Sequence, residues 1–295
     1  MIVYLNGKLV ERADATVSPF DRGFLFGDGV YEGLRSYKGR VFALAEHVER
    51  LAAGLEATRI RGFSARELGA IAGALIDANA IPDAFIYVQV TRGTPPIGDP
   101  PRERRASPGT HPTVFAYAAP TAPLAAERSP AVLSAAAVPD HRWRLGQVKG
   151  VSLLGNVMAA YDAAELDADD GVLVLPREDG SIDDACTISE ATATNIFASI
   201  NGEIVTPALS SAPMLSGVTR RVLVRELGGR AIERKVTLGE LRAADEIAVA
   251  GTRTMVARIG TFDGQPAGEC GLASELLDVL RKAIQAELDL AYGHG

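Results

Sequence analysis

Apolar residues recur at intervals of three and four along several stretches, and this spacing predicts amphipathic helices. Helices are expected over residues 45–60, 64–76, 156–166 and 272–292, and a further helix is opened by residues 215–220 and runs to the glycines at 228–229. Ser64 and Glu67 have the S-x-x-E spacing of a capping box, which marks the start of the second helix. Thr237 and Glu240 repeat this spacing and predict a further helix start.

Shorter apolar runs bounded by turn residues predict β-strands. Strands are expected over residues 1–5, 8–10, 85–91, 113–118, 132–138, 171–175, 195–200, 203–205 and 245–250. The Asn-Gly pairs at 6–7 and 201–202 favour the tight turns of β-hairpins. Because the strands and helices do not alternate regularly, we predict an α+β fold.

A stretch rich in alanine and proline divides the chain. Residues 120–130 form the best candidate for an interdomain linker, since prolines punctuate them and no apolar period crosses them. We therefore predict an N-terminal domain over residues 1–119 and a C-terminal domain over residues 131–295. Within the first domain, residues 94–112 contain six prolines and are expected to form a long loop, a type that is often functional.

Composition narrows the class of protein. The formal net charge of −7 argues against a nucleic-acid-binding protein, which would usually carry a concentrated basic face. Its two cysteines form no CxxC pair, and no metal-ligand spacing connects the four histidines, His47, His111, His141 and His294. No apolar run approaches eighteen residues and no leader-like segment opens the chain. We expect a cytoplasmic protein with reduced thiols and neither a metal site nor a membrane partner.

Lys149 stands among apolar and small residues, in the stretch QVKGVSLLGN. The chain has only five lysines, so arginine supplies most of its positive charge. Desolvation lowers the pKa of a lysine and makes its amine nucleophilic, which suits imine formation. The alternative is a surface lysine that keeps its ammonium group in water.

Three features suit a phosphate group. Gly217, Val218 and Thr219 lie at an expected helix start, where free backbone amides attract anions. Gly251 and Thr252 end a predicted strand and offer similar donors, and Arg50 is a candidate partner for the charge. Each feature also has an ordinary structural reading, as a cap or a loop residue. Neither a Walker-type nor a GxGxxG motif is present, so nucleotides are disfavoured.

Glu190 precedes a run of small residues that leads into a strand. It either caps a surface turn or forms a partly buried carboxylate. In the second case it can pair with a protonated pyridine nitrogen, the arrangement that pyridoxal phosphate chemistry requires. Nearer the N-terminus, Gly23, Gly27 and Gly29 are closely spaced before a strand, which indicates either a tightly packed backbone or an edge bend.

Taken together, these motifs resemble those of the class IV, fold type IV aminotransferases. The resemblance covers nearly the whole chain and is strongest at DRGFLFGDGVYEGLR, EHVERL, IYVQVTRGTPP, RWRLGQVKGVSLLGN, SEATATNIF, LSGVTR and DEIAVAGTRT. It implies a smaller N-terminal α/β domain, a larger C-terminal pseudo-barrel domain, pyridoxal 5′-phosphate as the cofactor and a homodimer. Its substrates would be amino acids and keto acids.

The resemblance also implies roles for individual residues. Lys149 matches the Schiff-base lysine, and Glu190 matches the partner of the pyridine nitrogen. Leu215 matches the residue that packs against the cofactor ring, and Tyr31 matches a tyrosine of the substrate pocket. The residues that match the phosphate site are Arg50, Val218, Thr219, Gly251 and Thr252.

The residues of several of these motifs most resemble those of D-amino acid aminotransferase. However, that group's usual carboxylate clamp, an arginine and a histidine two positions apart, is replaced here by Ile97 and Asp99. Arg253 is our candidate for a substitute cation because it follows Thr252 directly. Arg35 is the reserve, and the loop arginines Arg102, Arg104 and Arg105 are further options.

We therefore predict a D-amino acid transaminase with an atypical carboxylate site, and activity on (R)-primary amines stays open. An L-branched-chain aminotransferase is the main alternative. Aminodeoxychorismate lyase is a less favoured alternative within the family. A non-catalytic dimeric binding protein on the same scaffold is disfavoured because Lys149 and Glu190 are both present.

Overall fold

A computed structural model describes residues 1–292. His294 therefore lies outside the described residues. The chain forms two compact units, one of residues 1–126 with 148–153 and one of residues 127–147 with the described residues from 154 onward. Helices and sheets in two units confirm the predicted two-domain α+β fold. Residues 148–153, which the sequence analysis assigns to the C-terminal domain, group with the first unit instead.

The first unit is built on a six-stranded sheet in the order β2-β1-β6-β5-β3-β4. All of its pairings are antiparallel. The strands are β1 (Ile2–Leu5), β2 (Lys8–Glu11), β3 (Gly29–Tyr37), β4 (Arg40–Val41), β5 (Ala84–Thr94) and β6 (His111–Pro120). The helices of this unit are α1 (Arg22–Phe26), α2 (Leu44–Thr58) and α3 (Leu68–Asn79).

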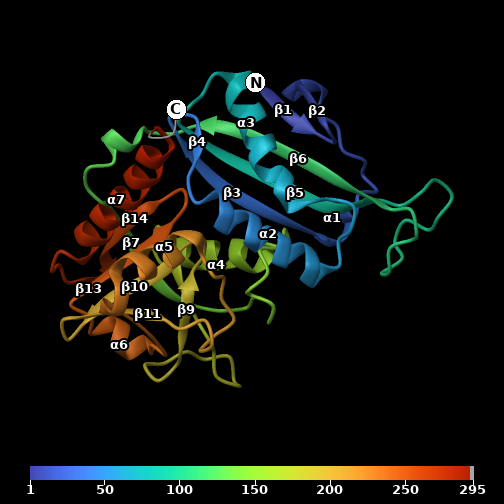
Figure 1. The fold of residues 1–295 in the computed structure, drawn as a ribbon. Coiled ribbons are helices and arrows are strands. Elements are labelled where there is room, and N and C mark those ends of the chain that lie inside the picture. Colours follow the sequence, from blue (N-terminus) through green and yellow to red (C-terminus); the bar gives the residue numbers. More distant parts are fainter. Residues whose placement is uncertain (293–295) are drawn as a thin grey trace. The chain divides into compact units, whose positions relative to one another are not determined.

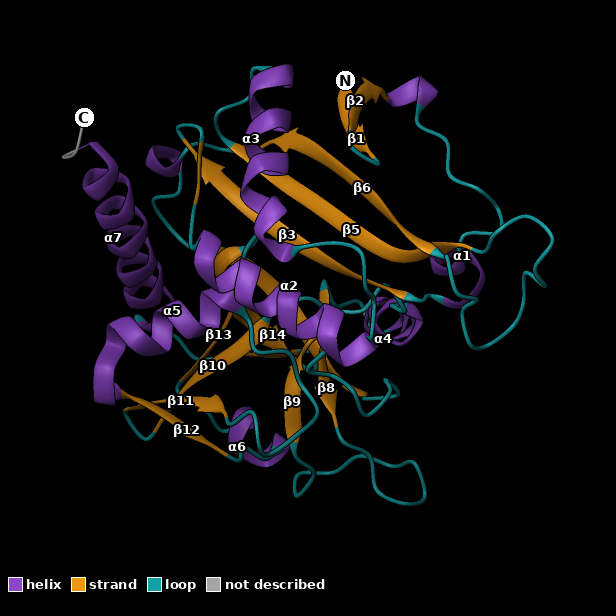
Figure 2. Cartoon of the chain, turned by 45° about the vertical axis from the view of Figure 1, so that its right-hand side comes forward, coloured by secondary structure: helices purple, strands orange, loops and turns teal. Residues whose placement is uncertain are grey.

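Period-two alternation in the strands decides which face of this sheet is buried. Val30 and Leu34 of β3 and Ile86 and Val88 of β5 point to one face, where they form a core with α2 and α3. Figures 1 and 2 show α3 crossing the sheet and α2 running beside β3. The expected capping box at Ser64 is confirmed, although it first opens a short 3₁₀ turn that leads into α3.

The second unit contains a nine-stranded mixed sheet. Eight strands follow the order β12-β11-β10-β13-β14-β7-β8-β9, and β15 pairs with β14. These strands are β7 (Ala131–Pro139), β8 (Asp170–Val174), β9 (Ile188–Ala191), β10 (Asn195–Ile200), β11 (Glu203–Pro207), β12 (Ala231–Arg234), β13 (Glu246–Gly251), β14 (Met255–Phe262) and β15 (Gln265–Pro266). The helices are α4 (Leu154–Glu165), α5 (Val218–Leu227), α6 (Leu238–Arg242) and α7 (Leu272–Tyr292).

The long C-terminal helix α7 is fixed at its start by a buried carboxylate. Glu246 of β13 accepts hydrogen bonds from the backbone N–H groups of residues 270–273 at 2.6–3.0 Å. Burial alone would raise the pKa of Glu246, but these donors lower it below its ordinary value. The negative charge also complements the positive end of the helix dipole.

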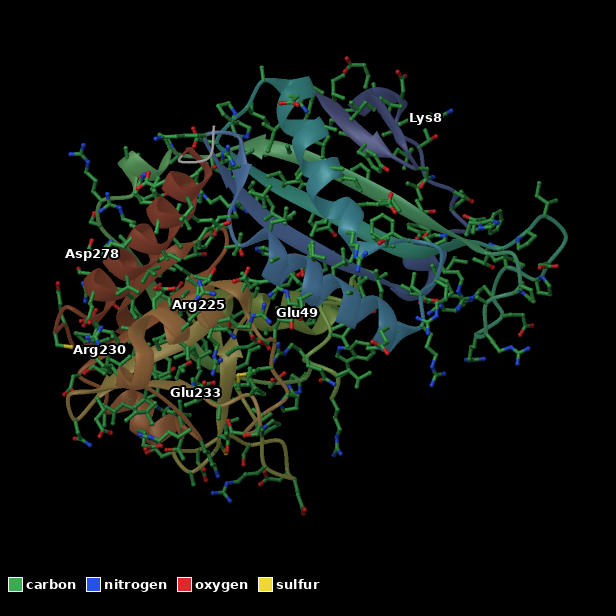
Figure 3. The ribbon with its side chains drawn as sticks, viewed as in Figure 1. Lys8, Glu49, Arg225, Arg230, Glu233 and Asp278 are labelled. Carbon is green, nitrogen blue, oxygen red and sulfur yellow. The ribbon has the colours of Figure 1, made fainter. Side chains whose placement is uncertain are left out.

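Charged side chains such as Lys8 and Asp278 point into solvent (Figure 3).

A helix that spans a membrane must be long and apolar, and a metal-binding protein needs a cluster of ligand side chains. Among residues 1–292, no helix combines the length and apolar character needed to span a membrane. Within the same residues, no group of three or more His, Cys, Asp or Glu side chains is arranged to hold a metal ion.

Candidate active site

Lys149 is held by backbone pairing with β3 in the first unit. The N–H of Tyr31 donates to the carbonyl oxygen of Lys149 at 3.0 Å, and Val30 forms a β-bridge with Gly150. The N–H of Val151 donates to the carbonyl oxygen of Gly29, also at 3.0 Å. The lysine backbone is therefore fixed to the core strand of its unit rather than carried on a free loop.

The glycines before β3 make this close approach possible. A Cβ atom at Gly27 would collide with the hydroxyl of Ser152, and one at Gly29 would lie 3.2 Å from Val151. Gly27 also has a φ of 65°, which favours glycine. The expectation of a tightly packed backbone is confirmed, and the packed partner is the segment that carries Lys149.

The lysine side chain lies over an aromatic ring. The Nζ atom of Lys149 is 4.3 Å from the ring centroid of Tyr31, a cation–π distance. The Tyr31 ring lies 5.4 Å from that of Tyr87 on the neighbouring strand. Tyr31, predicted as a pocket residue, is therefore in direct contact with the predicted Schiff-base lysine.

Arg50 forms an ion pair that the sequence analysis did not anticipate. Its Nε and Nη2 atoms donate to the two carboxylate oxygens of Glu32 at 2.8 and 2.7 Å. The Nδ1 atom of His47 lies 2.7 Å from the same carboxylate. Glu32 is fully buried, so this bidentate pair fixes the Arg50 side chain against β3.

The electrostatics of this cluster follow from its burial. Burial would raise the pKa of Glu32, but the charge and hydrogen bonds of Arg50, together with His47, lower it to about 2. Burial also lowers the pKa of His47 despite its contact with Glu32. At neutral pH the cluster therefore contains an ionised carboxylate, a guanidinium and a neutral imidazole.

In the second unit, Glu190 lies buried on β9. Its Oε1 atom accepts from the Nη1 atom of Arg142 at 2.6 Å and from the backbone N–H of Leu215 at 3.1 Å. Its Oε2 atom accepts from the Nδ2 atom of Asn195 at 3.1 Å. Three donors thus orient the carboxylate, and one of them is the backbone amide of the predicted ring-contact residue Leu215.

The predicted phosphate residues of the second unit gather around the start of α5. Gly217 is the N-cap of this ten-residue helix, and no side chain caps it. A Cβ atom at Gly217 would collide with the Oδ1 atom of Asn195, so only glycine fits. Val218 and Thr219, the first residues of the helix, are buried. The uncapped amides and the helix dipole suit a phosphate, so the residues present fit the predicted cofactor.

Gly251 and Thr252 lie at the end of β13, the strand next to β10. Asn195 is paired with Ala250 in the register of these two strands. A Cβ atom at Gly251 would lie 3.0 Å from the methyl group of Thr194. Strand pairing therefore brings the residues at 251 and 252 to the same end of the sheet as Asn195 and Glu190.

The candidate carboxylate-binding residues occupy different environments. Arg35 is buried in the first unit, where its Nη2 atom donates to the carbonyl oxygen of Ala122 at 2.9 Å. Arg253 is exposed in the turn that follows β13. Ile97 is fully exposed in the proline-rich loop, and Arg102 of that loop lies over the ring of Phe26.

Four residues that hold the candidate site residues in place were not predicted from the sequence: Glu32, His47, Arg142 and Asn195. Glu32 did leave a signal, because it lies between Val30 and Leu34 on the apolar face of a strand. A charge at such a position needs a buried partner. Arg142 and Asn195 lie in motifs that carry the resemblance, yet no local pattern pairs them with Glu190.

Comparison with known proteins identifies the family. The family model for amino-transferase class IV matches residues 29–261. The chain belongs to the class IV aminotransferases. Enzymes of this class depend on pyridoxal phosphate, so the predicted cofactor is confirmed. The predicted enzyme type, an aminotransferase, is also confirmed.

Two relatives of this aminotransferase represent two different substrate groups. The D-alanine aminotransferase of Bacillus licheniformis is 34% identical over 289 residues, which cover 97% of this chain and 96% of the relative. A "Putative branched-chain-amino-acid aminotransferase" of Methanocaldococcus jannaschii is also 34% identical, over 273 residues that cover 90% of this chain and 89% of the relative. Sequence identity therefore places the enzyme equally near both.

Solved structures share the fold. The branched-chain aminotransferase of Thermoproteus uzoniensis with norvaline has a TM-score of 0.80 and 25% identity, covering 97% of this chain and 95% of that chain. The branched-chain amino acid aminotransferase from Escherichia coli has a TM-score of 0.75 at 24% identity, covering 94% of this chain and 91% of that chain. The second likeness concerns the fold alone.

The Glu32–Arg50 pair predicts a pH-dependent stability defect. Replacing Arg50→Met leaves Glu32 buried without its cation and should lower the free energy of unfolding by about 3–5 kcal/mol at neutral pH. The folded-state pKa of Glu32 is lowered to about 2. The ionised carboxylate therefore contributes its full stability above the ordinary pKa of a glutamate, and this contribution is lost as the pH falls toward 2. The difference between wild type and variant should therefore shrink on acidification, measured by urea unfolding.

The double variant Glu32→Gln/Arg50→Met is the matched control. It removes both charges, so it should regain part of the stability at neutral pH and show a flatter pH dependence than Arg50→Met. A loss that is equal at all pH values in the single variant would contradict the assigned ionisation of Glu32.

Proposed function

We propose that this enzyme transfers the amino group of a D-amino acid to a 2-keto acid, with Lys149 as its Schiff-base residue. At the same 34% identity, the D-alanine aminotransferase of Bacillus licheniformis covers 97% of the chain and the branched-chain relative covers 90%, and this wider match carries the proposal. Further D-alanine aminotransferases, such as that of Staphylococcus haemolyticus at 30% identity, support the same group. The sequence motifs that contain Tyr31, Arg92 and Lys149 also resemble those of the D-amino acid group.

Each residue has a defined task in this proposal. Pyridoxal phosphate, when bound, supplies an aldehyde for imine formation and a ring that withdraws electrons from the reacting carbon. Lys149 acts as the mobile base, which removes a proton from the substrate Cα and returns it at the product carbon. An arginine could not replace it, because a guanidinium stays protonated.

The remaining residues bind and orient. Glu190 holds a proton at the ring nitrogen through its oriented carboxylate. The amides at the start of α5, with Thr219, Thr252 and Arg50, bind the phosphate. Leu215 packs against the ring and Tyr31 lines the substrate side.

Arg253 is our proposed partner for the substrate carboxylate. Arg35 fits this role less well, because its guanidinium is buried and donates to the carbonyl oxygen of Ala122. The exposed Arg253 follows Thr252, which the proposal places at the phosphate. A guanidinium also matches the geometry of a carboxylate better than the Ile97 side chain that replaces the usual clamp.

L-branched-chain aminotransferase activity is the second candidate. The relative from Methanocaldococcus jannaschii favours it, because it matches this chain at the same 34% identity. The structure with norvaline from Thermoproteus uzoniensis, at 25% identity, supports it further.

We also propose that the enzyme works as a homodimer. Leu154, Val157, Met158 and Tyr161 lie at positions i, i+3, i+4 and i+7 of α4, and all four are exposed, Leu154 by 72% and Tyr161 by 64%. The opposite face of α4 already packs through Ala159 and Ala163. An exposed apolar stripe on a helix usually marks an interface, and a second copy of the chain is the partner that the family resemblance implies.

Substrate preference is tested by single-turnover reactions. The Schiff-base absorption of the cofactor should disappear at least about tenfold faster with D-alanine or D-glutamate than with L-leucine, a difference of about 1.4 kcal/mol in the barrier. The reverse order would assign the enzyme to the branched-chain group.

The same assay tests Arg253. Arg253→Ala should raise KM for D-alanine by roughly tenfold or more, since a charge-assisted hydrogen bond is worth about 1.5–3 kcal/mol. KM for (R)-1-phenylethylamine, which lacks a carboxylate, should stay unchanged if it reacts. Arg177→Ala, at an exposed ion pair, is the matched control. Equal effects of Arg253→Ala on both substrates would remove Arg253 from this role.

The dimer is tested by sedimentation velocity. The wild type should sediment at twice the chain mass of 31.0 kDa. Met158→Glu/Tyr161→Glu should sediment as a monomer with an unchanged circular dichroism spectrum, because desolvating a carboxylate at an apolar interface is unfavourable. Lys282→Glu, on the exposed side of α7, should remain dimeric. A monomeric wild type, or a dimeric double variant, would contradict the proposal.

A further inference from the structure

Arg142 joins two acidic side chains in the second unit. Its Nη1 atom donates to Oε1 of Glu190 at 2.6 Å, while its Nε and Nη2 atoms donate to the two oxygens of Asp140 at 2.9 and 2.8 Å. The guanidinium is nine-tenths buried, and Nη2 also lies 3.2 Å from the carbonyl oxygen of Pro213. This geometry fixes the guanidinium on both sides.

Asp140 is in turn anchored as an ionised group. It accepts from the hydroxyl of Ser189 at 3.0 Å and from the backbone N–H of Arg142 at 3.1 Å. Burial would raise the pKa of Asp140, but the hydrogen bonds and charge of Arg142 lower it. Burial would lower the pKa of Arg142, but the two carboxylates raise it. Asp140 and Arg142 therefore stay charged, and the guanidinium lies between the carboxylates of Asp140 and Glu190.

The cation acts on one side of the Glu190 carboxylate. Arg142 and the N–H of Leu215 both donate to Oε1, whereas Oε2 accepts from the side-chain amide of Asn195. A fixed positive charge 2.6 Å from Oε1 stabilises the carboxylate and lowers its affinity for a proton. Because the site is buried, this effect is stronger than it would be in water.

We propose that Arg142 is a positioning residue that keeps the proton shared by Glu190 and the cofactor's ring nitrogen on the nitrogen. This rests on the proposed function, in which Glu190 faces that nitrogen. One proton is shared by two bases, and it resides on the stronger base. Without Arg142 the carboxylate becomes more basic, so the N–H bond breaks, an O–H bond forms on Glu190 and the ring becomes neutral. A neutral ring withdraws electrons less well.

The test uses enzyme loaded with pyridoxal phosphate that carries ¹⁵N in the ring. The wild type and Arg142→Lys should give the ¹⁵N chemical shift of a protonated pyridine. Arg142→Met should shift toward the value of neutral pyridine and should slow the single-turnover reaction by about a hundredfold, within the range for proton-transfer groups. Arg177→Met, at an exposed ion pair, should match the wild type in both measurements.

If Arg142→Met does not fold, Arg142→Met/Asp140→Asn removes the uncompensated charge of Asp140 and is predicted to show the same ¹⁵N shift. A protonated-pyridine shift in either folded variant would overturn the proposal and leave Arg142 with a structural role. That outcome is distinct from failure of the proposed function, in which the wild type itself would show no Schiff base at Lys149.

Discussion

A carboxylate that is removed from water stays ionised only where fixed donors surround it. Both units meet this constraint at a residue next to the proposed chemistry. Glu32 is held by Arg50 and His47, and Glu190 is held by Arg142 with the amides of Leu215 and Asn195. Removing one partner from such a pair costs several kcal/mol. The strands and helices that carry the partners must therefore keep the positions that allow these contacts.

The constraint links the fold to the proposed function. Arg50 is oriented by Glu32 on β3, the same strand whose Tyr31 contacts Lys149. Glu190 is connected through Asn195 to Gly217 at the start of α5, where phosphate-binding amides are expected. Charged partners thus hold Glu190 and Arg50, the residues proposed to bind the ring nitrogen and the phosphate, in fixed orientations. Such preorganisation reduces the reorganisation needed during the reaction.

Much of the fold could be predicted from local pattern. The hairpin of β1 and β2, the stripes of α2 and α7 and the two capping boxes follow from residue spacing alone. The candidate site residues were chosen from short motifs, such as the glycine at a helix start and the lysine among apolar residues, and their roles came from the resemblance, so they stay predictions. Glycine spacing even indicated a close contact, although the partner, residues 150–152, was not named.

The missing parts depend on contacts that are distant in sequence. Arg142 and Glu190 are 48 residues apart, and Glu32 and Arg50 are 18 apart, so no local period connects them. Nor could spacing reveal that residues 148–153 group with the first unit, since this depends on the β-bridge between Val30 and Gly150. Substrate choice is a difference between similar affinities, so no local sequence pattern determines it.

The central claim is that the amine of Lys149 binds the cofactor covalently. The most direct measurement is borohydride reduction of the cofactor-loaded enzyme, followed by proteolysis and mass spectrometry of the tagged peptide. The account predicts a reduced pyridoxyl group on Lys149 and a protein without the tag after Lys149→Ala. A tag on any of the other four lysines, or on none, would contradict it.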